Sequence, residues 1–146
     1  MKKPPFVLFA FFVLALSLSS AEEKSFRFPG GDGEAGGEAF VALNCIQCHT
    51  VKGTDLEKPK GKQRLNLVLG AETRFVRSYE DIIRAITNPK HVVTQQYREI
   101  LSRSERAGGI EPLMPDMTKD MSARQLIDLV AFLDAVYAES IQEYRK

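Results

Sequence analysis

The residues best suited to chemistry form one short run, Cys45-Ile46-Gln47-Cys48-His49. It holds both cysteines of the chain and one of its two histidines. The C-x-x-C-H spacing is typical of covalent haem attachment. Two thiols three positions apart lie on one side of a helical turn, where each can add to a different vinyl group of the porphyrin, and the adjacent imidazole is placed to bind the iron. The motif predicts one covalently bound haem c, with Cys45 and Cys48 as attachment sites and His49 as the proximal iron ligand.

Three other uses of such a motif fit the rest of the chain less well. A structural zinc site needs four Cys or His ligands, and only His91 remains outside the motif. A thioredoxin-like dithiol belongs to a βαβ context, and the sequence has no convincing alternating strand pattern. A disulfide in an oxidising compartment would leave His49 without a role.

The sequence alone leaves the sixth ligand of the iron open. The candidates are Met114, Met117, Met121, His91 or no ligand at all. Met114 stands just ahead of the last expected helix, in a loop that Pro115 would stiffen. A methionine in such a place is otherwise a flexible filler of core gaps. Spacing does not rank these candidates.

Short helices must position these residues. The last helix has the clearest pattern, because Ser122 and Gln125 form a capping-box pair and apolar residues then repeat at helical spacing. Ser78 is a candidate N-cap for an earlier helix that ends before Asn88-Pro89. The expected helices are residues 36–44, 79–86, a weaker one at 91–101, and the one after Ser122; residues 55–64 and 102–111 are expected to be polar loops.

These elements indicate an all-α fold, a small helical domain wrapped around one covalent haem. Four or so short helices bury little apolar surface, and small domains often need an additional source of stability. The apolar surface of a haem would supply it.

The N-terminus is typical of an export signal. Lys2 and Lys3 precede an apolar run over residues 6–18, and small residues at 19–21 suit a cleavage site. The run is shorter than the ~20 apolar residues that span a bilayer. We therefore expect a cleaved signal peptide at residues 1–21, a flexible glycine-rich leader at 22–35, a domain at 36–146 and no stable membrane span after cleavage. The mature protein is expected to be periplasmic or otherwise extracytoplasmic.

The overall charge excludes one class of partner. The net charge is +1, and it becomes −1 without Lys2 and Lys3. Such a near-neutral chain carries no electrostatic footprint for nucleic acid. Partner choice must then depend on local patches.

Over residues 36–137 the sequence resembles the class I (mitochondrial-type and bacterial) monohaem cytochrome c family. The resemblance rests on the attachment motif, on Gly37 and Phe40 before it, on residues 82–89, on Met114-Pro115 and on residues 129–133. In many bacterial members the methionine of a Met-Pro pair is the distal ligand, so the resemblance implies Met114, with Met117 as the second choice. It also implies that the first and last helices cross at Gly37, Phe40, Leu129 and Phe132.

The resemblance implies an electron carrier and not an enzyme. Its expected partners are redox proteins, such as a dehydrogenase as donor or a terminal oxidase as acceptor. The alternatives are a haem subunit of a larger oxidase or dehydrogenase complex and, less well supported, a five-coordinate haem enzyme or gas sensor.

In one stretch the chain departs from the family pattern. The family usually carries a Gly-Pro-x-Leu stretch whose proline carbonyl accepts a hydrogen bond from the proximal histidine, whereas this chain has Arg64-Leu65-Asn66-Leu67. A backbone carbonyl can still serve, because the acceptor is main chain. The sequence does not identify the residue that provides it.

Overall fold

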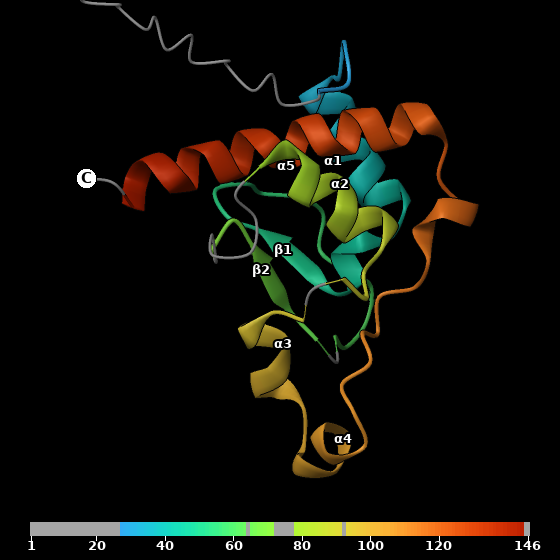
Figure 1. The fold of residues 1–146 in the computed structure, drawn as a ribbon. Helices are drawn as coiled ribbons and strands as arrows, with labels where there is room; N and C mark the ends of the chain where they lie inside the picture. The colour runs from blue at the N-terminus through green and yellow to red at the C-terminus, as the bar shows by residue number, and fades with distance from the viewer. Residues whose placement is uncertain (1–26, 64, 72–77, 92, 145–146) are drawn as a thin grey trace, which may run out of the picture.

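The structure is a computed structural model that describes residues 27–63, 65–71, 78–91 and 93–144. Helices dominate it (Figure 1), which confirms the expected all-α class. The α-helices are α1 (Gly33–Ala42), α2 (Tyr79–Thr87), α3 (Gln95–Ile100), α4 (Arg103–Ala107) and α5 (Ala123–Tyr144). Two short 3₁₀ helices, η1 (Cys45–Gln47) and η2 (Met117–Lys119), and two strands, β1 (His49–Val51) and β2 (Leu67–Leu69), complete the described elements.

α5 runs along one edge of the molecule, with α1 and α2 packed against it (Figure 1). In the same view the strands lie beyond these helices, and α3 and α4 lie farthest from α5. The main core joins α5 to both helices through buried apolar side chains. They include Phe40 from α1, Ile82 and Ile86 from α2, and Leu129, Val130 and Leu133 from α5.

The caps of the two best-predicted helices are confirmed. Ser78 and Asp81 form a capping box at the start of α2. At α5 the Ser122 hydroxyl oxygen accepts from the Gln125 amide at 3.2 Å, and the Gln125 carboxamide accepts from the Ser122 amide at 2.9 Å. Each pair satisfies two backbone donors that a helix start leaves free.

The N-terminal part of the domain differs from the expectation of a flexible leader at residues 22–35. α1 begins at Gly33, three residues earlier than expected, because the Asp32 carboxylate accepts from the Glu34 and Ala35 amides at 2.9 and 3.2 Å. Residues 22–26 and the expected signal segment, residues 1–21, lie outside the described residues.

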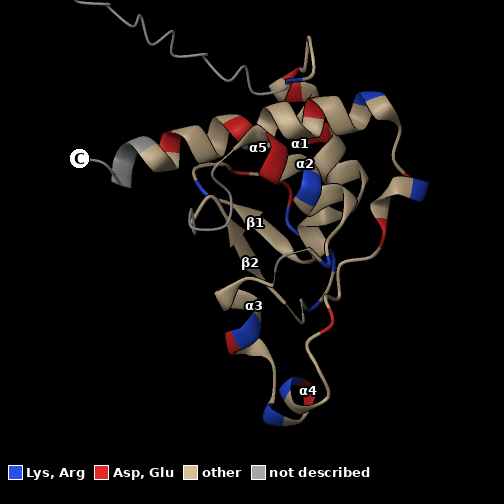
Figure 2. Ribbon diagram, in the orientation of Figure 1, with Lys and Arg blue, Asp and Glu red and all other residues tan. Residues whose placement is uncertain are grey.

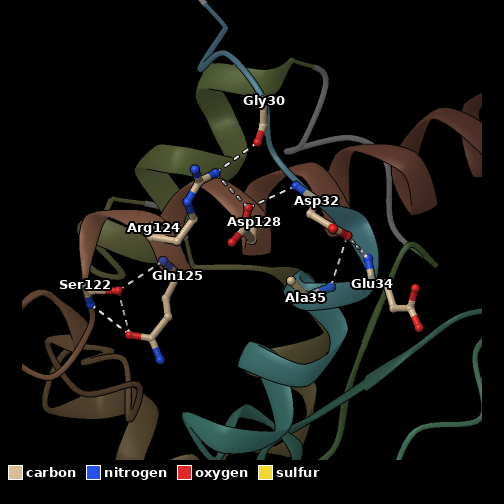
Figure 3. A network of polar contacts seen from close by, with 8 residues as sticks. All are labelled: Gly30, Asp32, Glu34, Ala35, Ser122, Arg124, Gln125 and Asp128. Atoms are coloured by element: carbon tan, nitrogen blue, oxygen red, sulfur yellow. Dashed lines mark hydrogen bonds and ion pairs between the residues drawn. The ribbon is translucent and has the colours of Figure 1, made fainter.

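Residues 27–32 also pack against the domain. The Arg27 guanidinium lies 2.6 Å from an Asp134 carboxylate oxygen and its carbon lies 5.0 Å from the centre of the Tyr79 ring. Figure 3 shows the next contacts along the chain, where Arg124 donates to the Gly30 carbonyl at 3.0 Å. The glycine content suggested flexibility, but here it permits close packing against α5.

A buried carboxylate holds the end of this segment. Asp128 is 6% exposed and accepts from the Asp32 amide at 2.9 Å, with the Arg124 guanidinium at 3.5 Å (Figure 3). The Asp32 amide precedes the first turn of α1, so this bond ties the start of α1 to the middle of α5.

α1 and α5 cross where expected, with a correction to the glycine. The Phe40 and Phe132 rings meet edge to face at 6.0 Å, and Leu129 is buried. However, a Cβ on Gly36 would lie 2.1 Å from the Asp128 carbonyl oxygen, whereas one on Gly37 would lie 3.8 Å from the nearest atom of Phe132. The close approach of the backbones therefore requires Gly36 and not Gly37.

The connection between the two ends of the chain holds four elements that differ from expectation. β1 and β2 pair in parallel, with His49 opposite Leu67; each strand is too short to show an alternating pattern. The third helix is limited to α3, after a Thr94 cap. The expected loop at 102–111 contains α4, which a Ser102–Glu105 capping box starts and which has no buried residue.

α3 forms a second, smaller core beneath the strands. Leu65, Tyr97 and Leu101 are its buried members, and Cys48, Leu67, Val93 and Ile110 pack against them. No helix of the described residues is long and apolar enough to cross a membrane.

Candidate functional site

A wide cleft of about 630 Å³ collects most of the residues that the sequence singles out. Cys45, Cys48 and His49 line it, and so do Met114 and Met117 from the other end of the chain. This volume lies within the range of about 300–1,000 Å³ for small-molecule and cofactor sites. The fold therefore brings the attachment motif and two candidate distal ligands to one place.

The attachment motif is folded as a tight turn. Asn44, between α1 and η1, has φ 62°, a left-handed conformation that asparagine tolerates better than most residues. In η1 the Cys48 amide then donates to the Cys45 carbonyl at 3.1 Å. Both cysteines line the cleft, Cys45 beside the main core and Cys48 beside the smaller one.

Gln63 fixes the outer part of this turn. Its side-chain amide donates to the Ile46 carbonyl at 2.9 Å and lies 3.4 Å from the Gln47 carbonyl. These carbonyls belong to the two residues between the cysteines. A contact between residues so far apart in sequence leaves no local signal, so sequence reasoning missed it.

No disulfide joins Cys45 to Cys48. Burial raises the pKa of the Cys45 thiol to about 11. Cys45 therefore stays protonated at neutral pH, the form in which a thiol supplies both the sulfur and the hydrogen for addition to a vinyl group. A thiolate ligand to a metal ion would be disfavoured there.

His49 begins β1 and is oriented by the strand pair. Burial lowers the pKa of its imidazole, and the backbone of Leu67 opposes part of this effect. The Nδ1 atom is buried and has no hydrogen-bond partner among the described residues. Of the stretch 64–67 that replaces the family's proline motif, Leu67 is the residue that lies opposite His49 in the strand pair; Arg64 lies outside the described residues.

The methionines separate into two groups. An adjoining apolar pocket is lined by Met114, Met117 and Met121 together with His49. Met121 also packs against the main core, in keeping with a gap-filling role. Met114 and Met117 belong to neither of the two described core clusters, so their thioethers are not committed to core packing.

His91 lies at the edge of the same cleft. Its side chain is exposed, and its Nε2 atom lies 3.3 Å from an Arg84 guanidinium nitrogen. Among the described residues, no group of three or more His, Cys, Asp or Glu gathers as a metal site.

The residues present fit a covalently held haem. The cleft offers two thiols, a buried imidazole nitrogen that lacks a partner among the described residues, and thioethers outside the core. The adjoining pocket is almost wholly apolar, with aliphatic side chains such as Leu69, Ile82 and Leu133. Imidazole and thioether are ligands that proteins use for haem iron.

A comparison with protein families identifies the chain. The model of the cytochrome c family matches residues 33–136, which span α1 to most of α5. The chain therefore belongs to the cytochrome c family, carries a covalently bound haem c and acts as a haem-based electron carrier whose partners are redox proteins. No curated protein and no solved structure matched the chain.

Proposed function

We propose that this cytochrome is an exported monohaem carrier of single electrons, with Cys45 and Cys48 bound to the haem and His49 and Met114 as axial ligands. The observation that carries the proposal is the meeting of all four residues at one cleft. Each thiol would add across one vinyl group of the haem, with the sulfur bound to one vinyl carbon and the thiol hydrogen to the other. The addition consumes no oxidant or reductant.

Met114 is favoured over the other methionines by its position. Met121 is used by the main core, and Met117 begins η2, where backbone hydrogen bonds fix it in a short helix. Met114 precedes Pro115, whose ring restricts the backbone of the segment. A methionine held in this way can meet the iron with little loss of conformational entropy.

The ligand pair and the pocket favour a high reduction potential. A methionine ligand raises the potential, and an apolar surrounding disfavours the extra charge of oxidised iron. With both axial positions filled, the iron has no open place for a substrate. Both properties suit a carrier between a dehydrogenase and a terminal oxidase of a respiratory chain.

The Met114 assignment is tested by Met114→Ala, with Met117→Ala as the matched control. Met114→Ala should remove the methionine-to-iron absorption band of the oxidised protein, lower the reduction potential and let carbon monoxide bind the reduced protein rapidly. Met117→Ala should keep the band. The reverse pattern would move the ligand to Met117, and rapid carbon monoxide binding by the unaltered protein would favour a five-coordinate enzyme or sensor.

Export is the second part of the proposal. It is supported by the charged and apolar pattern of residues 1–21 and by the packing of residues 27–32 on the domain. Cleavage after Ala21 leaves that packed segment intact. The mass of the protein purified from the periplasm should correspond to a chain that starts at Glu22 and carries one haem.

A further inference from the structure

α3 lies between two segments that border the cleft. Its residues Gln96 and Tyr97 are neighbours in sequence, and both line the cleft. The Gln96 side chain is hydrogen-bonded to β2, which pairs with the strand that contains His49. The Tyr97 hydroxyl is hydrogen-bonded to the segment that leads to Met114. One turn of helix thus connects the two parts of the site.

The Gln96 side chain completes the outer edge of β2. In the parallel pair, the Leu67 amide donates to the Cys48 carbonyl at 2.8 Å, and the Lys52 amide donates to the Leu69 carbonyl at 2.9 Å. Val68, between them, therefore directs its polar groups away from β1. The Gln96 carboxamide accepts from the Val68 amide at 3.1 Å and lies 3.5 Å from its carbonyl. The Gln96 side chain thus occupies the backbone groups of Val68 that a third strand would otherwise bind.

This edge bond affects the attachment side of the cleft. β2 provides the amide that donates to the Cys48 carbonyl, and its residue Leu67 lies opposite His49 in the strand pair. A two-stranded sheet of three residues each has little stability of its own. Gln96 therefore holds in place the strand that orients Cys48 and His49.

The Tyr97 hydroxyl acts on the methionine side. It donates to the Glu111 carbonyl at 2.7 Å, three residues before Met114. The ring is 5% exposed and belongs to the second core, against which Cys48 and Ile110 both pack. The same side chain thus contacts the neighbourhood of both predicted ligands.

We propose that α3 is a brace that sets the relative position of the two axial ligands, with Gln96 and Tyr97 as positioning residues for His49 and Met114. The inference rests on the proposed ligand pair. Neither residue binds iron: Gln96 acts through β2, and Tyr97 acts through the Glu111 carbonyl.

The Tyr97 arm is tested by Tyr97→Phe in the haem-loaded protein. The variant keeps the ring in the second core and removes one hydrogen bond. The hydrogen bond from the Tyr97 hydroxyl to the Glu111 carbonyl holds the methionine segment. Loss of one such bond changes an equilibrium constant by about fivefold. Imidazole, as a competitor of Met114 for the iron, should bind about fivefold more tightly to the variant, and the reduction potential should fall.

The control for this variant is Tyr79→Phe. Tyr79 is equally buried, but it packs in the main core against Phe28 and Arg27 and does not line the cleft among the described residues. Its imidazole affinity should equal that of the unaltered protein. Equal affinities in Tyr97→Phe and Tyr79→Phe would overturn the Tyr97 arm.

The Gln96 arm is tested by Gln96→Leu against Gln95→Leu. Gln95 precedes it on α3 and donates to Glu99 within the same helix at 2.8 Å. Gln96→Leu should loosen β2 and with it the strand that carries His49, so the reduction potential should differ from that of the unaltered protein, because contacts that orient an iron ligand tune the metal. Gln95→Leu should leave the potential unchanged. A potential that is the same in both variants contradicts this arm.

Failure of the brace and failure of the ligand assignment give different results. If the unaltered protein lacks the methionine band, the proposed ligand pair is wrong. If the band is present and neither Tyr97→Phe nor Gln96→Leu differs from its control, only the brace is wrong.

Discussion

Gly36 sets the distance between α1 and α5. A Cβ on this residue would lie 2.1 Å from the Asp128 carbonyl oxygen and 2.7 Å from the Phe132 Cβ. Both atoms belong to a long helix and have no freedom to withdraw. The neighbouring Gly37 has only ordinary contacts, the nearest at 3.8 Å. Two adjacent glycines thus differ in what they do.

Gly36→Ala is therefore expected to destabilise the protein by about 2–3 kcal/mol, in the range for forced overpacking. Gly37→Ala is the matched control. Alanine is favoured over glycine inside a helix by up to about 1 kcal/mol, so this variant should be neutral or slightly more stable. Denaturant unfolding of both variants measures the difference. Equal losses in the two would contradict the crossing geometry.

The same pair shows what sequence can provide at the scale of residues. The chemistry of Cys45, Cys48 and His49 could be predicted, because their spacing is local and the motif is specific. The choice between Gly36 and Gly37 could not, since it depends on which one faces a backbone carbonyl almost a hundred residues away. Gln63, Gln96 and Tyr97 were missed as supports of the site for the same reason.

At the scale of elements, the segment before α1 is held by Asp128. The carboxylate accepts the Asp32 amide, and Arg124 joins it to the Gly30 carbonyl. The buried acceptor is the important partner here. An amide left unpaired in a partly buried place costs its full desolvation penalty, whereas an exposed ion pair contributes little.

Asp128→Ala should lower the free energy of unfolding by about 1–3 kcal/mol because it leaves the Asp32 amide unpaired. Asp128→Asn keeps an acceptor oxygen and should recover much of this loss. Arg124→Ala, whose side chain is 68% exposed, should cost less than about 1 kcal/mol. Thermal unfolding of the three variants tests this order. A larger loss of stability in Arg124→Ala than in Asp128→Ala would contradict the role given to the buried carboxylate.

The elements that could be predicted from sequence are those with local signals. Ser78 and Ser122 start α2 and α5 as expected, because a capping box lies within four residues. The strands could not be predicted, since their pairing depends on Cys48 and Leu67 meeting across a loop. The Ser102–Glu105 capping box was a usable signal for α4, but the polar composition of the segment concealed it.

At the scale of the whole molecule, the cleft lies between two cores. The main core joins α1, α2 and α5, and the smaller one lies around Tyr97. Residues from both, such as Leu129 and Leu65, line the cleft and its adjoining pocket. A haem bound there would connect the two cores, so it should contribute strongly to the stability of the fold.

The charges of the molecule are mixed at this scale. Figure 2 shows acidic and basic residues together on α2, α3, α4 and α5, whereas α1 carries only the acidic Glu34 and Glu38. Overall charge therefore does not select the redox partner, which agrees with the near-neutral total.

The most direct test of the account is whether haem stays with the polypeptide after denaturation. The mature protein should be coloured, should keep its haem through acid-acetone extraction, and should have the mass of the chain plus one haem, with the added mass on a peptide that contains Cys45 and Cys48. The Cys45→Ala/Cys48→Ala double variant should lose all three properties. A colourless protein, an extractable haem, or a disulfide between the two cysteines would contradict the central claim.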